Sequence, residues 1–210
     1  MNKKTQKIAL TGVLIAVGTL LSVFVVFKMP YGGTITAFSM VPVMVLGYKY
    51  GMKWGLFSGL IFGILQMILG ATTSGAFAGM SGFNLVLMAL LDYIVAFVVL
   101  GSAGMFRNKI KNDIAAFALG GAVAGFLRFV CHFLSGLILW GSYAEWFFTD
   151  VFVNSFSAKI METCTGTTLA AVYSFIYNAL YMVPEIIITV IGIVVIMAVV
   201  PLKKLIVSKD

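Results

Sequence analysis

Six long apolar stretches, separated by short polar turns, constrain this chain more than any other feature of its sequence. A helix of about 20 apolar residues crosses the hydrocarbon core of a bilayer, so 210 residues leave room for about six such helices. Apolar residues make up 61% of the chain and charged residues 10%, far from the composition of a soluble domain. The sequence therefore predicts an all-α integral membrane protein.

The six predicted helices form one compact bundle, a single membrane domain that covers residues 1–210. Their approximate ranges are 8–27, 35–48, 54–70, 83–106, 114–140 and 167–201. The second range is short for a span, and the last contains Pro184, which predicts a kink or a tilted entry. Lysines precede the first range as in a signal peptide, but no small-residue cleavage site follows it, so we expect a retained helix.

Basic residues are distributed unevenly between the turns. If six helices alternate in direction, eleven of the fourteen basic residues fall on the side of the two termini. These are Lys3, Lys4, Lys7, Lys49, Lys53, Arg107, Lys109, Lys111, Lys203, Lys204 and Lys209. Cytoplasmic loops carry such an excess, so we expect both termini in the cytoplasm. Because these residues are scattered over short turns and have no aromatic platform between them, we do not expect a nucleic-acid partner.

Ionisable side chains inside a span are costly and usually mark function. Four fall within the predicted helices, namely Asp92, Arg128, His132 and Glu185. Counted at 1.5 Å per residue from the outer face, Asp92 and His132 lie at a similar depth of roughly 12–13 Å. Tyr173 and Asn178 lie at about 8–15 Å by the same count. An acid, an imidazole, a phenol and an amide from three helices in one layer indicate a ligand pocket open to the outside.

The spacing of side chains supports this pocket. Arg128, His132, Gly136 and Trp140 recur every four residues and therefore lie on one face of the fifth helix. Gly136 leaves space where a flat ring could lie against the helix. The aromatic faces come from Tyr93, Trp140, Tyr143 and Tyr173. An acid among aromatic rings suits a flat, cationic or polar heteroaromatic ligand.

Other interpretations of these residues remain open at this point. Arg128 and Glu185 could pair with each other inside the bundle instead of contacting a ligand. Trp140 and Trp146 could belong to an outer aromatic belt. On the first helix, Gly12 and Ala16 form a small-residue face that suits either packing within the bundle or docking onto another membrane subunit.

Residues 128–143, RFVCHFLSGLILWGSY, resemble the fifth-helix signature of the thiamine-specific S-component of energy-coupling factor (ECF) transporters. Residues 39–63, 90–101 and 172–189 resemble the same family in the same order. The resemblance implies a thiamine-binding membrane subunit of an ATP-driven vitamin uptake transporter in a prokaryotic cell membrane. It implies as partners thiamine, a transmembrane coupling subunit and two cytoplasmic ATPase subunits, with no cofactor and no metal.

The resemblance also implies roles for particular residues. The substrate-binding positions are Asp92, Tyr93, His132, Gly136, Trp140, Tyr173 and Asn178, with Phe62 as a further aromatic position. Gly12 and Ala16 are the positions implied for docking of the coupling subunit. The family pattern has a glutamate where Asp92 stands and a shorter segment in place of residues 145–167.

Three alternatives belong to other classes of protein or ligand. The chain could be an S-component for a different vitamin, or a carrier that works without ATPases. Residues 79–82, GMSG, match the GxSG motif of rhomboid-like intramembrane serine proteases, and His132 could serve as the base. Ser81 lies at the outer mouth of its helix, however, whereas His132 lies roughly 12 Å deep. A nucleophile needs its base within about 3 Å, so the two residues are too far apart. We therefore expect no enzyme.

Overall fold

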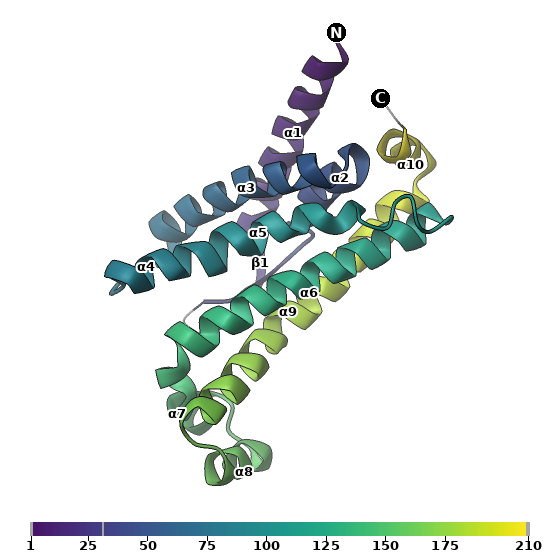
Figure 1. Ribbon diagram of the computed structural model, residues 1–210. Coiled ribbons are helices and arrows are strands. Elements are labelled where there is room, and N and C mark those ends of the chain that lie inside the picture. The colour runs from purple at the N-terminus through teal and green to yellow at the C-terminus, as the bar shows by residue number, and fades with distance from the viewer. Residues whose placement is uncertain (1, 31, 209–210) are drawn as a thin grey trace.

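The computed structural model describes residues 2–30 and 32–208. Lys209, one of the basic residues counted above, lies outside this part of the chain. Helices make up most of the molecule (Figure 1). Among the described residues, five helical segments are long and apolar enough to cross a membrane: Lys3–Val23, Met52–Thr73, Gly82–Gly104, Asp113–Leu139 and Gly166–Ala198. A mostly helical membrane fold is confirmed, whereas the count of six spans is not, and a short β-hairpin departs from the all-α expectation.

Three of these segments are single α-helices, α1 (Lys3–Val23), α6 (Asp113–Leu139) and α9 (Gly166–Ala198). A fourth joins α3 (Met52–Leu69) to the π-helical turn η1 (Gly70–Ser74). The fifth changes geometry along its length, from α4 (Gly82–Met88) through the π-helix η2 (Ala89–Val95) and α5 (Ala96–Val98) to the 3₁₀-helix η3 (Val99–Gly104). The helix α9 continues through Pro184. The helices α6 and α9 lie side by side, α3 runs beside the α4–α5 segment, and α1 is steeply inclined to both groups (Figure 1).

The range 35–48 does not form one helix. Its first part belongs to an antiparallel hairpin of β1 (Val25–Lys28) and β2 (Thr34–Thr36), in which Val25 pairs with Thr36. The helix α2 (Val41–Tyr50) has 10 residues, a length of about 15 Å that is half of what a span needs. Apolar content alone predicted a span here, but the β-branched residues of the strands extend the chain into a hairpin.

The strand β2 and the helix α2 are packed against the long helices, whereas β1 is exposed. Every residue of α2 from Val41 to Lys49 is buried. Strands at membrane depth must bond within the protein because lipid offers no hydrogen-bond partner, and here β1 and β2 pair with each other and β2 contacts α9. Together the hairpin and α2 lead the chain from the end of α1 to the start of α3.

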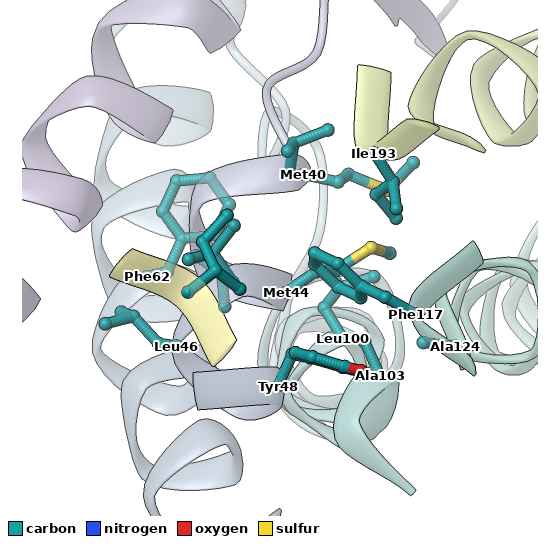
Figure 2. Close-up of a cluster of buried hydrophobic side chains, with 14 of the residues drawn as sticks. Met40, Met44, Leu46, Tyr48, Phe62, Leu100, Ala103, Phe117, Ala124 and Ile193 are labelled. Atoms are coloured by element: carbon teal, nitrogen blue, oxygen red, sulfur yellow. The ribbon is translucent and has the colours of Figure 1, made fainter. Parts of the chain in front are cut away.

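The main hydrophobic core surrounds α2 (Figure 2). Met40, Met44 and Leu46 are fully buried there, and the ring of Tyr48 stacks on Phe117 of α6 with 4.5 Å between centroids. The backbones approach closely at Gly47, where a Cβ atom would overlap the carbonyl oxygen of Gly101. This small-residue packing is typical of membrane helices, and it fixes the half of the bundle that lies beneath the cavity described below.

One end of the bundle collects the N-terminus of α1, the α2–α3 turn, the 107–113 loop and the C-terminal helix α10 (Val200–Val207), as Figure 1 shows. The ammonium of Lys7 lies 3.9 Å from the centroid of the Trp54 ring. Lys49 Nζ donates to the carbonyl of Leu205 at 2.7 Å, and Arg107 Nη2 donates to that of Val207 at 2.6 Å. The basic turns that the charge pattern assigned to one side therefore lie together.

The opposite end holds short helices between α6 and α9. These are η4 (Gly141–Tyr143), α7 (Ala144–Trp146), η5 (Phe147–Val151) and α8 (Ser155–Thr163). Asn154 begins α8 with a capping box, since its side chain accepts from the backbone of Ser157 and the Ser157 hydroxyl accepts from the Asn154 backbone. Phe147 and Phe148 are buried against the N-terminal half of α9.

Candidate ligand-binding site

A cavity of about 810 Å³ lies between the hairpin, the helices α3, α6 and α9, and the π-helical part of the fifth segment. Such a volume is in the usual range for small-molecule sites. Charged side chains that line it are Lys28, Asp92, Arg128 and Glu185, together with His132. Aromatic rings line it from several elements, so the cavity combines charge with flat apolar faces.

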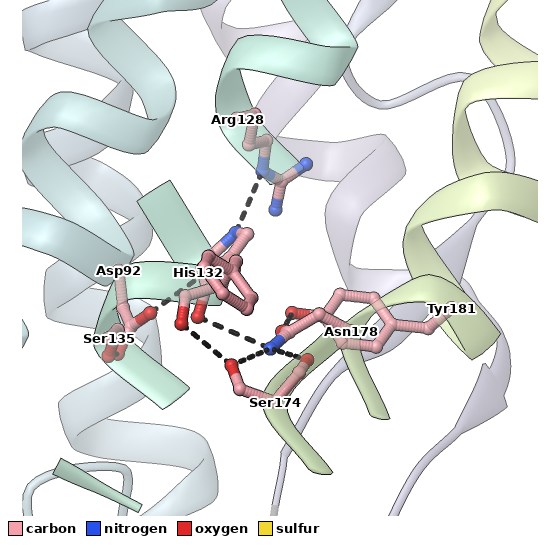
Figure 3. A network of polar contacts seen from close by, with 8 residues as sticks. Asp92, Arg128, His132, Ser135, Ser174, Asn178 and Tyr181 are labelled. Carbon is pink, nitrogen blue, oxygen red and sulfur yellow. Dashed lines mark hydrogen bonds and ion pairs between the residues drawn. The ribbon is translucent and has the colours of Figure 1, made fainter. Parts of the chain in front are cut away.

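Asp92 occupies the π-helical stretch η2, which places its carboxylate opposite α6. Its Oδ1 lies 2.9 Å from His132 Nδ1, and its Oδ2 accepts from the hydroxyl of Ser135 at 2.5 Å (Figure 3). The side chain remains 18% exposed in this position. A π-helical turn within an α-helix often accompanies a functional site, and here the acid is held by two neighbours while part of it faces the cavity.

His132 is the only histidine of the chain and both of its ring nitrogens have partners. Besides Asp92 at Nδ1, it has Arg128 Nε at 3.2 Å from Nε2. Its ring also contacts the ring of Tyr181, with centroids 6.1 Å apart. The hydrogen bonds of His132 therefore run to Asp92 and Arg128, and none joins it to Ser81, the serine of the GMSG motif.

A second set of polar contacts joins α6 to α9 (Figure 3). Asn178 Nδ2 donates to the carbonyls of His132 at 3.2 Å and Ser174 at 2.8 Å, while Tyr181 Oη donates to Asn178 Oδ1 at 2.6 Å. The helices approach closely at Gly136, because a Cβ atom there would lie 3.0 Å from Asn178 Nδ2. Gly136 thus sets the spacing of the two helices and also lines the cavity.

The hairpin forms another wall of the cavity, and α9 holds it through two residues spaced eight apart, Tyr177 and Glu185. Tyr177 donates to the carbonyl of Gly32 at 3.0 Å. Glu185 accepts from the backbone N–H and from the hydroxyl of Thr36, both at 2.6 Å. The Thr36 hydroxyl lies 2.6 Å from that of Ser39. Glu185 is 2% exposed, so this carboxylate joins the strand β2 to α9 deep inside the bundle.

Seven of the eight substrate-binding residues expected from the sequence line this one cavity: Asp92, Tyr93, His132, Gly136, Trp140, Tyr173 and Asn178. Phe62 does not line it. Its ring is fully buried in the main core and packs edge-to-face on Phe97 at 5.2 Å between centroids.

Two groups of lining residues were not singled out from the sequence. Tyr177 and Tyr181 lie four and eight residues after Tyr173, so the four-residue spacing applied to α6 would have found them on α9. Lys28 and Thr36 belong to the hairpin, whose position depends on contacts with distant residues, and nothing in their local sequence marks them. Glu185 was expected to pair within the bundle, and its hydrogen bonds run to Thr36.

The chemistry of the cavity favours recognition over catalysis. Asp92 offers negative charge, Asn178 and the hairpin offer hydrogen-bonding groups, and the rings offer stacking faces. Within the described residues, no group of three or more His, Cys, Asp or Glu side chains could hold a metal ion. The fold and the cavity together define a membrane-embedded protein that binds a small molecule within its helix bundle.

Comparison with known proteins identifies the family. The chain belongs to the family described as thiamine transporter protein (Thia_YuaJ), whose family model matches residues 8–172. The resemblance that residues 128–143 carry is thereby confirmed. A family of transporters also confirms that the chain is not an enzyme.

Similar proteins agree with this assignment. The thiamine transporter ThiT of Bacillus subtilis (strain 168) is 27% identical over 201 residues, which cover 90% of this chain and 89% of that protein. ThiT of Lacticaseibacillus paracasei is 26% identical over 116 residues, or 51% of this chain and 55% of that protein. The structure of ThiT from Listeria monocytogenes superposes with a TM-score of 0.69 at 20% identity, covering 95% of this chain and 97% of that one. The last comparison shows that the two share a fold.

Proposed function

We propose that this protein binds thiamine in the cavity between the hairpin and helices α6 and α9, on the extracellular side of the membrane. Family membership and the relatives named for thiamine transport support the ligand. The observation that carries the proposal is the partly exposed carboxylate of Asp92 among aromatic walls. Thiamine is a cation with two flat aromatic rings, so it matches both the charge and the rings of this site.

Each residue of the proposed site has a distinct role. Asp92 attracts the cation and accepts hydrogen bonds, and His132 holds Asp92 in place. Gly136 lets α6 and α9 approach closely at the cavity wall. Asn178 supplies an amide at the same depth. Tyr93, Trp140 and Tyr173 provide aromatic faces for stacking. We do not include Phe62, since its ring lies in the core and away from the cavity lining.

Titration of the detergent-solubilised protein with thiamine tests this proposal. Trp140 and Trp146 both line the cavity, so thiamine should quench the intrinsic tryptophan fluorescence in a saturable way. Riboflavin and biotin serve as controls and should bind far more weakly, because neither carries a fixed positive charge. A flat fluorescence titration with thiamine, together with flat calorimetry, would refute the proposed ligand.

We further propose that the protein is the S-component of an ECF transporter and works with a transmembrane coupling subunit and two cytoplasmic ATPase subunits. The chain has no GxxxxGK[ST] nucleotide-binding motif of its own, so this arrangement supplies the energy for uptake. Helix α1 offers a surface for the coupling subunit, because Gly12 and Ala16 are exposed on it and, apart from the helix's own backbone, no atom of residues 2–30 and 32–208 lies within 4 Å of a Cβ atom built at Gly12. Small exposed residues permit close contact between membrane helices.

Bulky substitutions on α1 test the docking surface. Gly12→Leu and Ala16→Leu should lower thiamine uptake at least tenfold in cells that contain all subunits, while thiamine binding by the isolated protein stays nearly unchanged. Val17→Leu is the matched control, since Val17 is also exposed on α1 but points to another side of the helix. Unimpaired uptake by both small-residue variants would contradict docking at this surface, and uphill uptake by the purified chain alone would contradict the need for partners.

A further inference from the structure

The guanidinium of Arg128 is packed among groups that hold it in one position. Its Nη1 lies 3.0 Å from Met40 Sδ, and its carbon Cζ lies 4.4 Å from the centroid of the Phe97 ring. Its Nε points along α6 toward His132 Nε2, one helical turn away at 3.2 Å (Figure 3). Arg128 therefore presents one particular N–H group to one particular nitrogen of the histidine.

This contact determines where the proton of His132 resides. An arginine side chain has only donors, so the bond between Arg128 Nε and His132 Nε2 requires a lone pair on Nε2. A neutral imidazole carries one proton, which must then be on Nδ1. From Nδ1 the proton is donated to Asp92 Oδ1 at 2.9 Å. An imidazolium would have an N–H at both nitrogens and would place two cations against each other at Nε2.

We propose that Arg128 is a positioning residue for the ligand site, because it holds His132 as the neutral tautomer with the proton on Nδ1 and so directs that proton to Asp92. A neutral His132 orients the carboxylate without cancelling its charge. A charged His132 would form an ion pair with Asp92 and compete with a cationic ligand. This inference rests on the proposed thiamine site for its functional consequence, but the tautomer itself is a property of the ligand-free protein.

Nitrogen NMR of His132 tests the tautomer directly. Because the chain contains one histidine, protein labelled with ¹⁵N-histidine gives signals from His132 alone, provided that purification uses a tag without histidine. The shifts of the two ring nitrogens distinguish the two neutral tautomers from the imidazolium. We expect the protonated signal at Nδ1 in the ligand-free protein at neutral pH. A proton on Nε2, or an imidazolium, would overturn the inference.

Two substitutions of similar length separate the hydrogen bond of Arg128 from its charge. Arg128→Gln places an amide N–H at the same number of bonds from Cα as the arginine Nε, so it can still donate to His132 Nε2. Arg128→Met fills similar space and has no donor. We expect Gln to keep the Nδ1 tautomer and thiamine affinity within about threefold, whereas Met gives a mixture of tautomers and about a tenfold loss of affinity, the effect of one hydrogen bond.

The outcomes separate the inference from the proposed function. A methionine variant that keeps both the tautomer and the affinity would overturn the inference, and so would a glutamine variant that loses both. If the methionine variant does not fold, the spectrum of the unmodified protein and the glutamine variant still decide the matter. Absence of thiamine binding by the unmodified protein would refute the proposed function, while its histidine spectrum would still report the tautomer.

Discussion

At the scale of single residues, Asp92 is held by two neighbours and still reaches the cavity, and this combination predicts the effect of Asp92→Asn. An asparagine oxygen can accept from His132 Nδ1, and its amide can donate to the Ser135 hydroxyl, so both contacts of the carboxylate survive. Only the negative charge is lost. Loss of a charge partner in a desolvated site typically costs about 2–5 kcal/mol, so thiamine affinity should fall by a factor of roughly thirty to several thousand.

The same preparation of Asp92→Asn also tests a structural role for the acid. Thermal unfolding without ligand should be nearly unchanged, since a neutral amide is easier to keep inside a membrane protein than a carboxylate. Asp92→Glu is a useful control because it keeps the charge and restores the acid of the family pattern. Early unfolding of the asparagine variant with preserved thiamine affinity would assign Asp92 to the fold and remove it from the site.

Most of the site could be predicted from single residues because helices place side chains regularly. Asp92, His132 and Asn178 are polar groups in apolar spans, and their spacing alone put them in one layer. Phe62 carried no such signal, since a phenylalanine in an apolar helix looks the same whether it faces a cavity or the core. Its assignment came only from the family resemblance, and its ring lies in the core.

At the scale of elements, the hairpin is the part of the fold that could not be predicted. Residues 35–48 are apolar enough for a span, and a pattern of apolar residues does not distinguish a membrane helix from a buried strand followed by a short helix. The deciding contacts are long-range, since Glu185 and Thr36 are 149 residues apart in the chain. The sequence around either residue does not indicate which distant residue it contacts, so the pair is known only from the folded structure.

This contact predicts that Thr36→Val weakens the attachment of the hairpin. Valine keeps the shape and the backbone N–H bond of Thr36 but removes the hydroxyl that donates to Glu185 Oε1. Leaving a buried carboxylate with one bond fewer should cost about 1–3 kcal/mol of stability. Faster hydrogen exchange in β1 and β2 and a lower unfolding temperature would show this loss of stability. Thr36→Ser retains the hydroxyl and should behave like the unmodified protein, and equal behaviour of the two variants would contradict the role of this bond.

At the scale of the whole molecule, the distribution of basic residues along the sequence agrees with the positions of the turns in the fold. The basic turns were grouped by their charge alone, and the folded chain brings them to one end through contacts such as those of Lys49 and Arg107 with α10. The short helices after α6 lie at the other end of the bundle (Figure 1), and Tyr143 and Trp146 from them line the cavity. Because basic residues concentrate on the cytoplasmic side, we infer that the cavity faces outward and that both termini are cytoplasmic.

Cysteine labelling in intact cells tests this orientation. In a Cys164→Ser background the remaining Cys131 is buried, so an added exposed cysteine dominates the reaction with a membrane-impermeant maleimide. Glu162 is exposed on α8 and Lys109 is exposed in the loop between η3 and α6. Glu162→Cys should label in intact cells, whereas Lys109→Cys should label only after the membrane is opened. The reverse pattern would place the cavity on the cytoplasmic side, where it could not capture thiamine from outside the cell.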